Sequence, residues 1–186
     1  MKTAVVLHGV CDEEEYFKMD FPSPSNAHWF PWLQQNFLRA GLLCQALEMP
    51  RPYNPNYEEW KRTFEQLDID SLSIVVGHSA GCGFILKWLH ANPSIVLDKL
   101  IMVAPWLDPE RSAKDFLEFE LKDNALSNIK EVHILASNDD MESIKISVDE
   151  IMYKYPHINL HSFEEKGHFC LNDIGNTFEY LWDLCK

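Results

Sequence analysis

The feature that most constrains this chain is a serine flanked by glycines, placed between an apolar run and an amphipathic run. Gly77, Ser79 and Gly81 form a G-x-S-x-G pattern that follows the strand-like run 72–76 and opens the helix-like run 82–91. Small residues in such a pattern let the backbone turn sharply and hold the serine hydroxyl exposed on the crest. The pattern alone is weak, but its place between a strand and a helix predicts a nucleophile elbow.

Short apolar runs alternate with longer amphipathic runs along the rest of the chain. This alternation is typical of βα units and of a parallel sheet covered on both faces. The expected strands are 3–7, 42–47, 72–76, 99–104, 132–136 and 159–163, and the expected helices are 28–40, 57–67, 82–91, 142–155 and 173–184. The sequence therefore predicts an α/β fold, a three-layer α/β/α sandwich with about six mainly parallel strands, as a single domain over residues 1–186.

Candidate partners for the serine follow later strands. A serine hydroxyl is a weak nucleophile at neutral pH, so Ser79 needs a base within hydrogen-bond reach and an acid that orients this base. Asp139 and Asp140 follow the fifth expected strand, and His168 follows the last one. The carboxyl ends of parallel strands meet at one edge of a sheet, and the order Ser, Asp, His is that of a compact α/β-hydrolase fold. We expect His168 to be the base and one aspartate to be the acid, while the other caps the next helix.

The segment His8-Gly9-Val10 follows the first expected strand, where such enzymes supply an oxyanion donor. The backbone N–H groups of Val10 and Ala80 are the expected pair that meets the negative charge of a tetrahedral intermediate. A glycine at position 9 is also compatible with an ordinary turn.

Aromatic residues near the expected strand ends are candidates for an acyl pocket. We expect Trp29 and Trp106 to contact the substrate, although aromatic residues at such positions often belong to the core. The segment 106–131 between the fourth and fifth strands is too short for a large cap domain, so the site should be shallow or covered by a small flap. A small carboxylic ester or a short acyl or aminoacyl amide fits these limits, with ester hydrolysis favoured over peptidase or amidase activity.

Charge excludes one class of partner. The chain carries 29 acidic and 16 basic residues, a formal net charge of −13, which repels nucleic acid and disfavours phosphates and acyl-CoA as substrates.

No apolar run approaches the roughly 20 residues of a membrane span, and the apolar start, residues 1–9, is too short for a signal peptide. We expect a cytoplasmic protein that acts on a small molecule; nothing in the sequence indicates a protein partner.

The five cysteines are scattered and have neither C-x-x-C nor paired spacing. Disulfides, structural zinc and other metal sites are therefore not expected, and no motif calls for a cofactor. Cys11 and Cys170 should lie close to the reacting serine, so modification of either thiol is expected to inhibit the protein.

Several motifs together resemble one known family. They are His8-Gly9 and the segments 26–33, 49–52, 77–81, 137–140 and 167–169, and they span nearly the whole chain. They resemble the retinoblastoma-binding protein 9 family of small serine hydrolases, which includes bacterial YdeN-like members. The resemblance implies a triad at Ser79, Asp140 and His168. The segment 141–143 departs from the family, whose members carry proline there, so the choice between Asp139 and Asp140 stays open. The retinoblastoma-binding motif Leu-x-Cys-x-Glu is absent, and this binding is not expected.

A second hypothesis comes from another class of protein. An α/β-hydrolase fold can serve as a binding or regulatory module whose site is vestigial. The presence of Ser79, His168 and the aspartate pair argues against this hypothesis, because decay of a site usually removes one member first.

Overall fold

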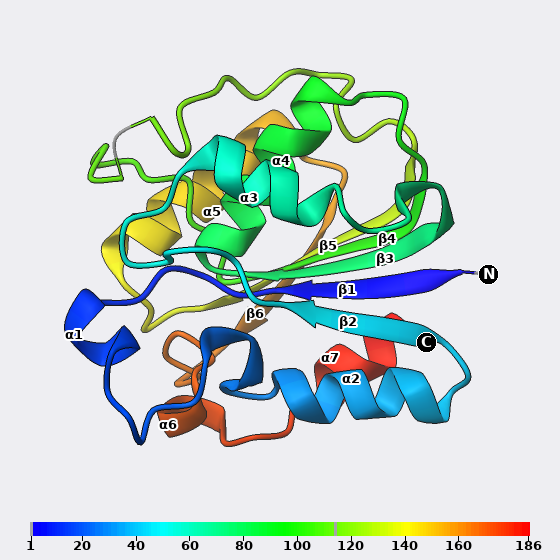
Figure 1. Ribbon diagram of the computed structural model, residues 1–186. Helices are drawn as coiled ribbons and strands as arrows, with labels where there is room; N and C mark the ends of the chain where they lie inside the picture. The colour runs from blue at the N-terminus through cyan, green and yellow to red at the C-terminus, as the bar shows by residue number, and fades with distance from the viewer. Residues whose placement is uncertain (1, 114) are drawn as a thin grey trace.

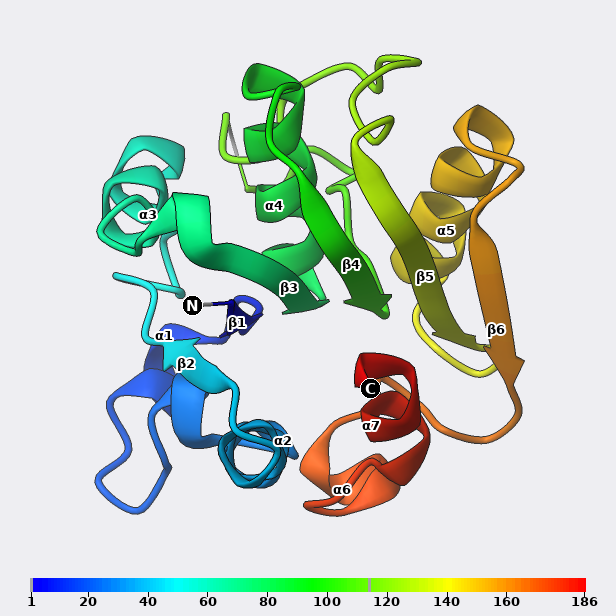
Figure 2. The same cartoon turned by 90° about the vertical axis from the view of Figure 1, so that its right-hand side faces the viewer.

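The computed structural model describes residues 2–113 and 115–186, and within them six parallel strands form one sheet (Figures 1 and 2). The strands are β1 (Thr3–Leu7), β2 (Leu43–Leu47), β3 (Leu72–His78), β4 (Leu97–Val103), β5 (Ile129–Ser137) and β6 (Asn159–Phe163). Their order in the sheet is β2-β1-β3-β4-β5-β6, and every neighbouring pair is parallel.

Helices cover both faces of the sheet, which makes three layers (Figure 1). One face carries α3 (Tyr57–Phe64), α4 (Ala80–Ala91) and α5 (Glu142–Lys154), and the other carries α2 (Phe30–Arg39), α6 (Leu171–Ile174) and α7 (Glu179–Cys185). The short helix α1 (Glu13–Tyr16) lies beyond the carboxyl ends of the strands, and single 3-10 turns occur at η1 (Pro24–Asn26) and η2 (Ile69–Ser71). The predicted fold class is confirmed.

The burial of each strand follows its place in the sheet. Every residue of the central strand β3 is buried, which is why this strand has a continuous apolar run rather than an alternating pattern. The edge strands β2 and β6 leave part of their residues exposed. The central strands therefore form a rigid support for the loops at their carboxyl ends.

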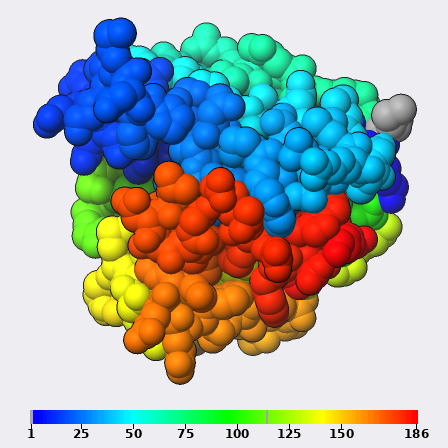
Figure 3. All heavy atoms as spheres, turned by 90° about the horizontal axis from the view of Figure 1, so that it is seen from below, coloured from blue at the N-terminus to red at the C-terminus, as the bar shows by residue number. Residues whose placement is uncertain are grey.

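On the face of the sheet that carries α2, α6 and α7, the N-terminal segment and the C-terminal segment adjoin (Figure 3). The rings of Phe37 in α2 and Trp182 in α7 pack edge to face there, with their centroids 5.3 Å apart.

Two boundaries differ from the sequence-based expectation in ways that affect these loops. Strand β3 continues to His78 and α4 begins at Ala80, so Ser79 alone makes the turn. The single helix expected over 173–184 is divided into α6 and α7, because Gly175 ends α6 with a φ of +80°.

The segment between β4 and β5, residues 104–128, contains no helix or strand in its described part. Of the helices that the structure describes, none has both the length and the apolar character needed to cross a bilayer.

Candidate active site

Ser79 occupies a strained turn between β3 and α4. Its φ of 54° and ψ of −124° lie where residues other than glycine are rarely found. The backbone holds it there: the Ser79 N–H donates to the carbonyl of Val103 at 2.9 Å, and its carbonyl accepts from the N–H groups of Cys82 at 3.0 Å and Trp106 at 3.2 Å. The predicted elbow geometry is therefore present, and neighbouring backbone fixes it.

Glycines near the elbow allow close backbone approach. A Cβ at Gly81 would lie 2.5 Å from the carbonyl oxygen of His8, and a Cβ at Gly9 would lie 2.8 Å from the Cβ of Ser79. Both distances are shorter than side chains tolerate. The loop after β1 thus packs directly against the serine because both segments carry glycine at the contact.

His168 and Asp140 meet at the same edge of the sheet. The Nδ1 of His168 lies 2.9 and 3.0 Å from the two carboxylate oxygens of Asp140, whose side chain is 1% exposed. The N–H of Met141 also donates to this carboxylate, at 2.7 Å. When Nδ1–H donates to Asp140, the Nε2 of His168 is left as the acceptor for a proton. His168 and Ser79 line the same cavity.

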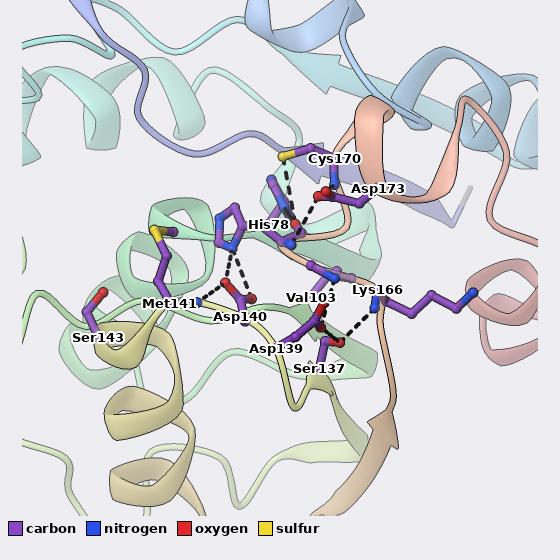
Figure 4. A network of polar contacts seen from close by, with 12 residues as sticks. His78, Val103, Ser137, Asp139, Asp140, Met141, Ser143, Lys166, Cys170 and Asp173 are labelled. Carbon is purple, nitrogen blue, oxygen red and sulfur yellow. Dashed lines mark hydrogen bonds and ion pairs between the residues drawn. The ribbon is translucent and has the colours of Figure 1, made fainter.

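The neighbouring aspartate has a different partner set (Figure 4). Asp139 accepts a hydrogen bond from the Ser137 hydroxyl at 2.5 Å and one from the N–H of Gly167 at 3.0 Å. The Ser137 hydroxyl holds the pKa of Asp139 below its usual value. Ser137 in turn accepts from the N–H of Lys166 at 3.0 Å. Asp139 therefore ties the turn after β5 to the loop of His168, whereas Asp140 is the aspartate that contacts the imidazole.

His78 connects the elbow with the loop of the base. Its Nε2–H donates to the carbonyl oxygen of His168 at 2.8 Å, and the two rings lie 4.9 Å apart. Complete burial lowers the pKa of His78 well below its usual value, so this imidazole is neutral. Asp173 holds the other side of the loop, where its carboxylate accepts from the N–H groups of His168 at 3.0 Å and Cys170 at 2.9 Å.

His8 fixes the loop that carries the expected oxyanion donor Val10. Its Nδ1–H donates to the carbonyl of Gly9 at 2.6 Å, and its Nε2 accepts from the N–H of Met49 at 2.8 Å. Burial lowers the pKa of His8, in agreement with this neutral form. Because the peptide group is planar, holding the Gly9 carbonyl also fixes the direction of the Val10 N–H. Ala80, the other expected donor, is the first residue of α4 and follows Ser79 directly.

A cavity of about 350 Å³ opens beside the serine. Its wall comes from the loop after β1, the segment 21–28 and the segment after His168. The lining residues are His8, Gly9, Val10, Cys11, Glu15, Phe21, Pro22, Pro24, Ala27, His28, His78, Ser79, His168, Cys170, Leu171 and Asn172. Among these lining residues Glu15 is the one carboxylate, and none is a lysine or an arginine.

The two tryptophans expected to contact the substrate are not among the residues that line this cavity. Trp29 is fully buried, and its indole N–H donates to the carbonyl of Phe169 at 3.0 Å, so it anchors the loop of His168 from inside the core. Trp106 supports the elbow through its backbone N–H. Five residues of the proline-containing segment 21–28 line the cavity together with Ser79.

Cys11 and Cys170 both line the cavity, as expected from their positions. Burial raises the pKa of Cys11 to about 11 and that of Cys170 to about 12. The thiolate is the reactive form of cysteine, so both thiols are poor nucleophiles at neutral pH. Their modification is therefore expected to be slow.

No group of three or more His, Cys, Asp or Glu side chains among residues 2–113 and 115–186 could hold a metal ion. Sequence reasoning did not single out the side chains of His8, His28 and His78. Each stands next to a residue that it did single out, but the direction of a side chain in a loop leaves no periodic signal in a sequence.

Comparison with known proteins finds similar chains. The model of the serine hydrolase family matches residues 21–183. YdeN from Bacillus subtilis (strain 168) is 27% identical over 172 residues, which cover 89% of this chain and 90% of YdeN.

Two solved structures extend the comparison. The crystal structure of the ydeN gene product from B. subtilis superposes with a TM-score of 0.81 at 22% identity, covering 100% of this chain and 97% of that one. A monoacylglycerol lipase from Paleococcus ferrophilus superposes with a TM-score of 0.63 at 13% identity, covering 100% of this chain and 94% of that one. At these identities the two structures are evidence for the fold alone.

Proposed function

The chain belongs to the serine hydrolase family, and we propose that it hydrolyses a small carboxylic ester through Ser79, His168 and Asp140. The observation that carries the proposal is the contact of His168 Nδ1 with the buried carboxylate of Asp140 at 2.9 Å, combined with the fact that His168 lines the same cavity as Ser79 on its strained turn. This arrangement has a nucleophile, a base and an acid that orients the base, which are the parts that acyl transfer requires.

The proposed reaction has two halves. In the first, His168 Nε2 takes the proton of the Ser79 hydroxyl while the serine oxygen attacks the ester carbonyl carbon, and the carbonyl oxygen becomes an anion. The N–H groups of Val10 and Ala80 stabilise this anion, and Asp140 stabilises the imidazolium. The ester C–O bond then breaks, the leaving alcohol takes the proton from Nε2, and an acyl-serine remains. In the second half, water attacks this acyl group by the same proton route, which releases the acid and restores Ser79.

The cavity supports a small, uncharged substrate. Its volume of about 350 Å³ suits a short acyl group with a modest alcohol, and no lysine or arginine stands among its described lining residues to bind an anionic group. A short acyl or aminoacyl amide is the second candidate, because the same groups can act on an amide. We also place the protein in the cytosol, since the five cysteines are free thiols.

The test is active-site labelling followed by kinetics. A fluorophosphonate probe should label the wild-type protein, and the Ser79→Ala variant should not be labelled. Ser79→Ala and His168→Ala should each lower kcat by about 10⁴- to 10⁶-fold on p-nitrophenyl esters while the melting temperature stays close to that of the wild type.

Chain-length series separate the two substrate classes. Parallel panels of p-nitrophenyl esters and p-nitroanilides with acyl groups of graded length should show faster turnover of short esters. A fall in kcat of less than tenfold in Ser79→Ala or His168→Ala would contradict the roles assigned to these residues. If the fluorophosphonate probe does not label the wild-type protein, the alternative of a binding module with a vestigial site is favoured.

A further inference from the structure

A second imidazole lines the cavity beside the reacting groups. His28 follows η1 and lies in the left-handed region with a φ of 56°, an uncommon conformation for a residue other than glycine. Its ring packs 5.5 Å from that of His78, and it lines the cavity together with Ser79 and His168. The proposed reaction does not use His28.

One nitrogen of this ring has a fixed role. The N–H of Leu171 donates to the Nδ1 of His28 at 3.0 Å, so this nitrogen carries a lone pair and no proton. A neutral imidazole with an unprotonated Nδ1 has its hydrogen on Nε2. Burial is the main cause that lowers the pKa of His28, and the nearby His168 lowers it further. A lowered pKa agrees with a neutral ring. His28 therefore presents Nε2–H as a hydrogen-bond donor.

The donor is free to meet a ligand. Among the described residues, the Nε2 of His28 has no hydrogen-bond partner. Every fully buried side-chain nitrogen or oxygen among these residues does have a partner, so Nε2 is not a fully buried atom. The Nε2 of this half-buried residue is therefore not sealed from solvent, and His28 lines the cavity of Ser79. Ser79 and His168 are used by the proposed reaction, whereas the Nε2–H of His28 has no partner or role among the contacts described so far.

We propose that His28 is a substrate-binding residue whose Nε2–H donates a hydrogen bond to a neutral oxygen of the substrate, other than the reacting carbonyl oxygen. The acceptor is a carbonyl, hydroxyl or ether oxygen rather than an anionic group, because Glu15 lines the same cavity and no lysine or arginine does so among the described residues. This inference rests on the proposed ester hydrolysis and narrows its substrate class: the preferred ester carries a further oxygen close to the reacting carbonyl.

Matched ester pairs test the proposal, because each pair replaces one oxygen by a methylene of similar size. On the acyl side, the pairs are p-nitrophenyl methoxyacetate with butyrate and 3-methoxypropionate with pentanoate. On the alcohol side, the pair is 2-methoxyethyl butyrate with butyl butyrate, followed by acid release. The variants are His28→Phe, which keeps an aromatic ring but has no nitrogen, and His28→Asn, which tolerates the left-handed backbone. The measured quantity is kcat/KM of the variant divided by that of the wild type, so that intrinsic ester reactivity cancels.

The expected result is a selective loss. In at least one pair, each variant should lower kcat/KM for the oxygen-bearing ester about tenfold more than for its hydrocarbon partner, which is the size expected for one neutral hydrogen bond. The pair that responds shows whether the oxygen belongs to the acyl or the alcohol part. Equal losses within twofold in every pair would overturn the role of His28, because a merely structural role lowers both partners alike. If the wild type hydrolyses no ester at all, the proposed function itself fails.

Discussion

The two ends of the sheet are stabilised by different means. Loops at the carboxyl end place residues other than glycine in the left-handed region: Arg51 after β2, Ser79 after β3, Ala104 after β4, and Glu165 and Phe169 after β6. At the amino end, the residue with positive φ before β2 is Gly41, which adopts it without strain. There the side chain of Asp98 contacts Lys2, Lys130 and Ser73, which lie at the starts of three other strands.

This difference separates function from stability. Strained conformations persist only where the surroundings determine them, and they collect at functional sites. Exposed ion pairs add little free energy and no chemistry. Substitutions at the carboxyl end should therefore change the rate of hydrolysis more than the stability, and substitutions at the amino end should do the opposite.

The largest contrast is expected between two adjacent aspartates at the carboxyl end. Asp140→Asn should lower kcat about 10⁴-fold, because the amide no longer holds His168 in the form that accepts the serine proton. Asp139→Asn keeps an oxygen that can accept from Gly167, so its loss of kcat should stay below about tenfold. Turnover of p-nitrophenyl butyrate by both variants, with melting temperatures as the folding control, measures the contrast. Equal losses would contradict the separate roles of the two carboxylates.

A pair of glycines compares the two ends directly. The new Cβ in Gly9→Ala would lie 2.8 Å from the Cβ and 3.2 Å from the hydroxyl oxygen of Ser79, so the nucleophile must shift and kcat/KM should fall about 10- to 100-fold. Gly41→Ala meets no atom within 4 Å but keeps a φ of +81°, so it should cost roughly 1 kcal/mol of unfolding free energy and leave kcat unchanged.

Urea unfolding and ester kinetics on both glycine variants check this comparison. A normal rate for Gly9→Ala would show that the loop after β1 yields to the added methyl group, and would weaken the claim that the carboxyl end is rigid.

The smallest effect is expected at the amino end. Hydrogen bonds from Lys130, Lys2 and Ser73 hold the pKa of Asp98 well below its usual range. Both lysine side chains are 67% exposed, so Asp98→Asn should cost less than about 1 kcal/mol and leave kcat unchanged. The folded-state pKa is lowered, so the stabilisation is complete at neutral pH and is lost as the pH falls below about 4, the usual pKa of an unfolded aspartate.

Melting curves of the wild type and Asp98→Asn between pH 7 and pH 2 test the sign. The gap between their melting temperatures should narrow toward the acid end, and a gap that widens there would contradict the assignment.

The sequence allowed prediction of the sheet and of the chain order of Ser79, the aspartate pair 139–140 and His168. These features depend on the alternation of apolar runs and on small residues at one turn, and both are local. The choice between Asp139 and Asp140 could not be made from the residues, because both follow β5 and their directions depend on the backbone of the turn. The residues that line the cavity could not be predicted from the sequence either. Trp29 gains the same hydrophobic free energy in the core as in a pocket, so only tertiary packing decides its place.

The cavity wall and the reacting groups come from different segments of the chain. The segment 21–28 builds a large part of the cavity wall but supplies none of the groups proposed to transfer a proton. Exchange of this loop for one of different length or polarity would therefore redesign which molecules enter while leaving the reactive centre in place. Directed evolution for new substrates is best concentrated there.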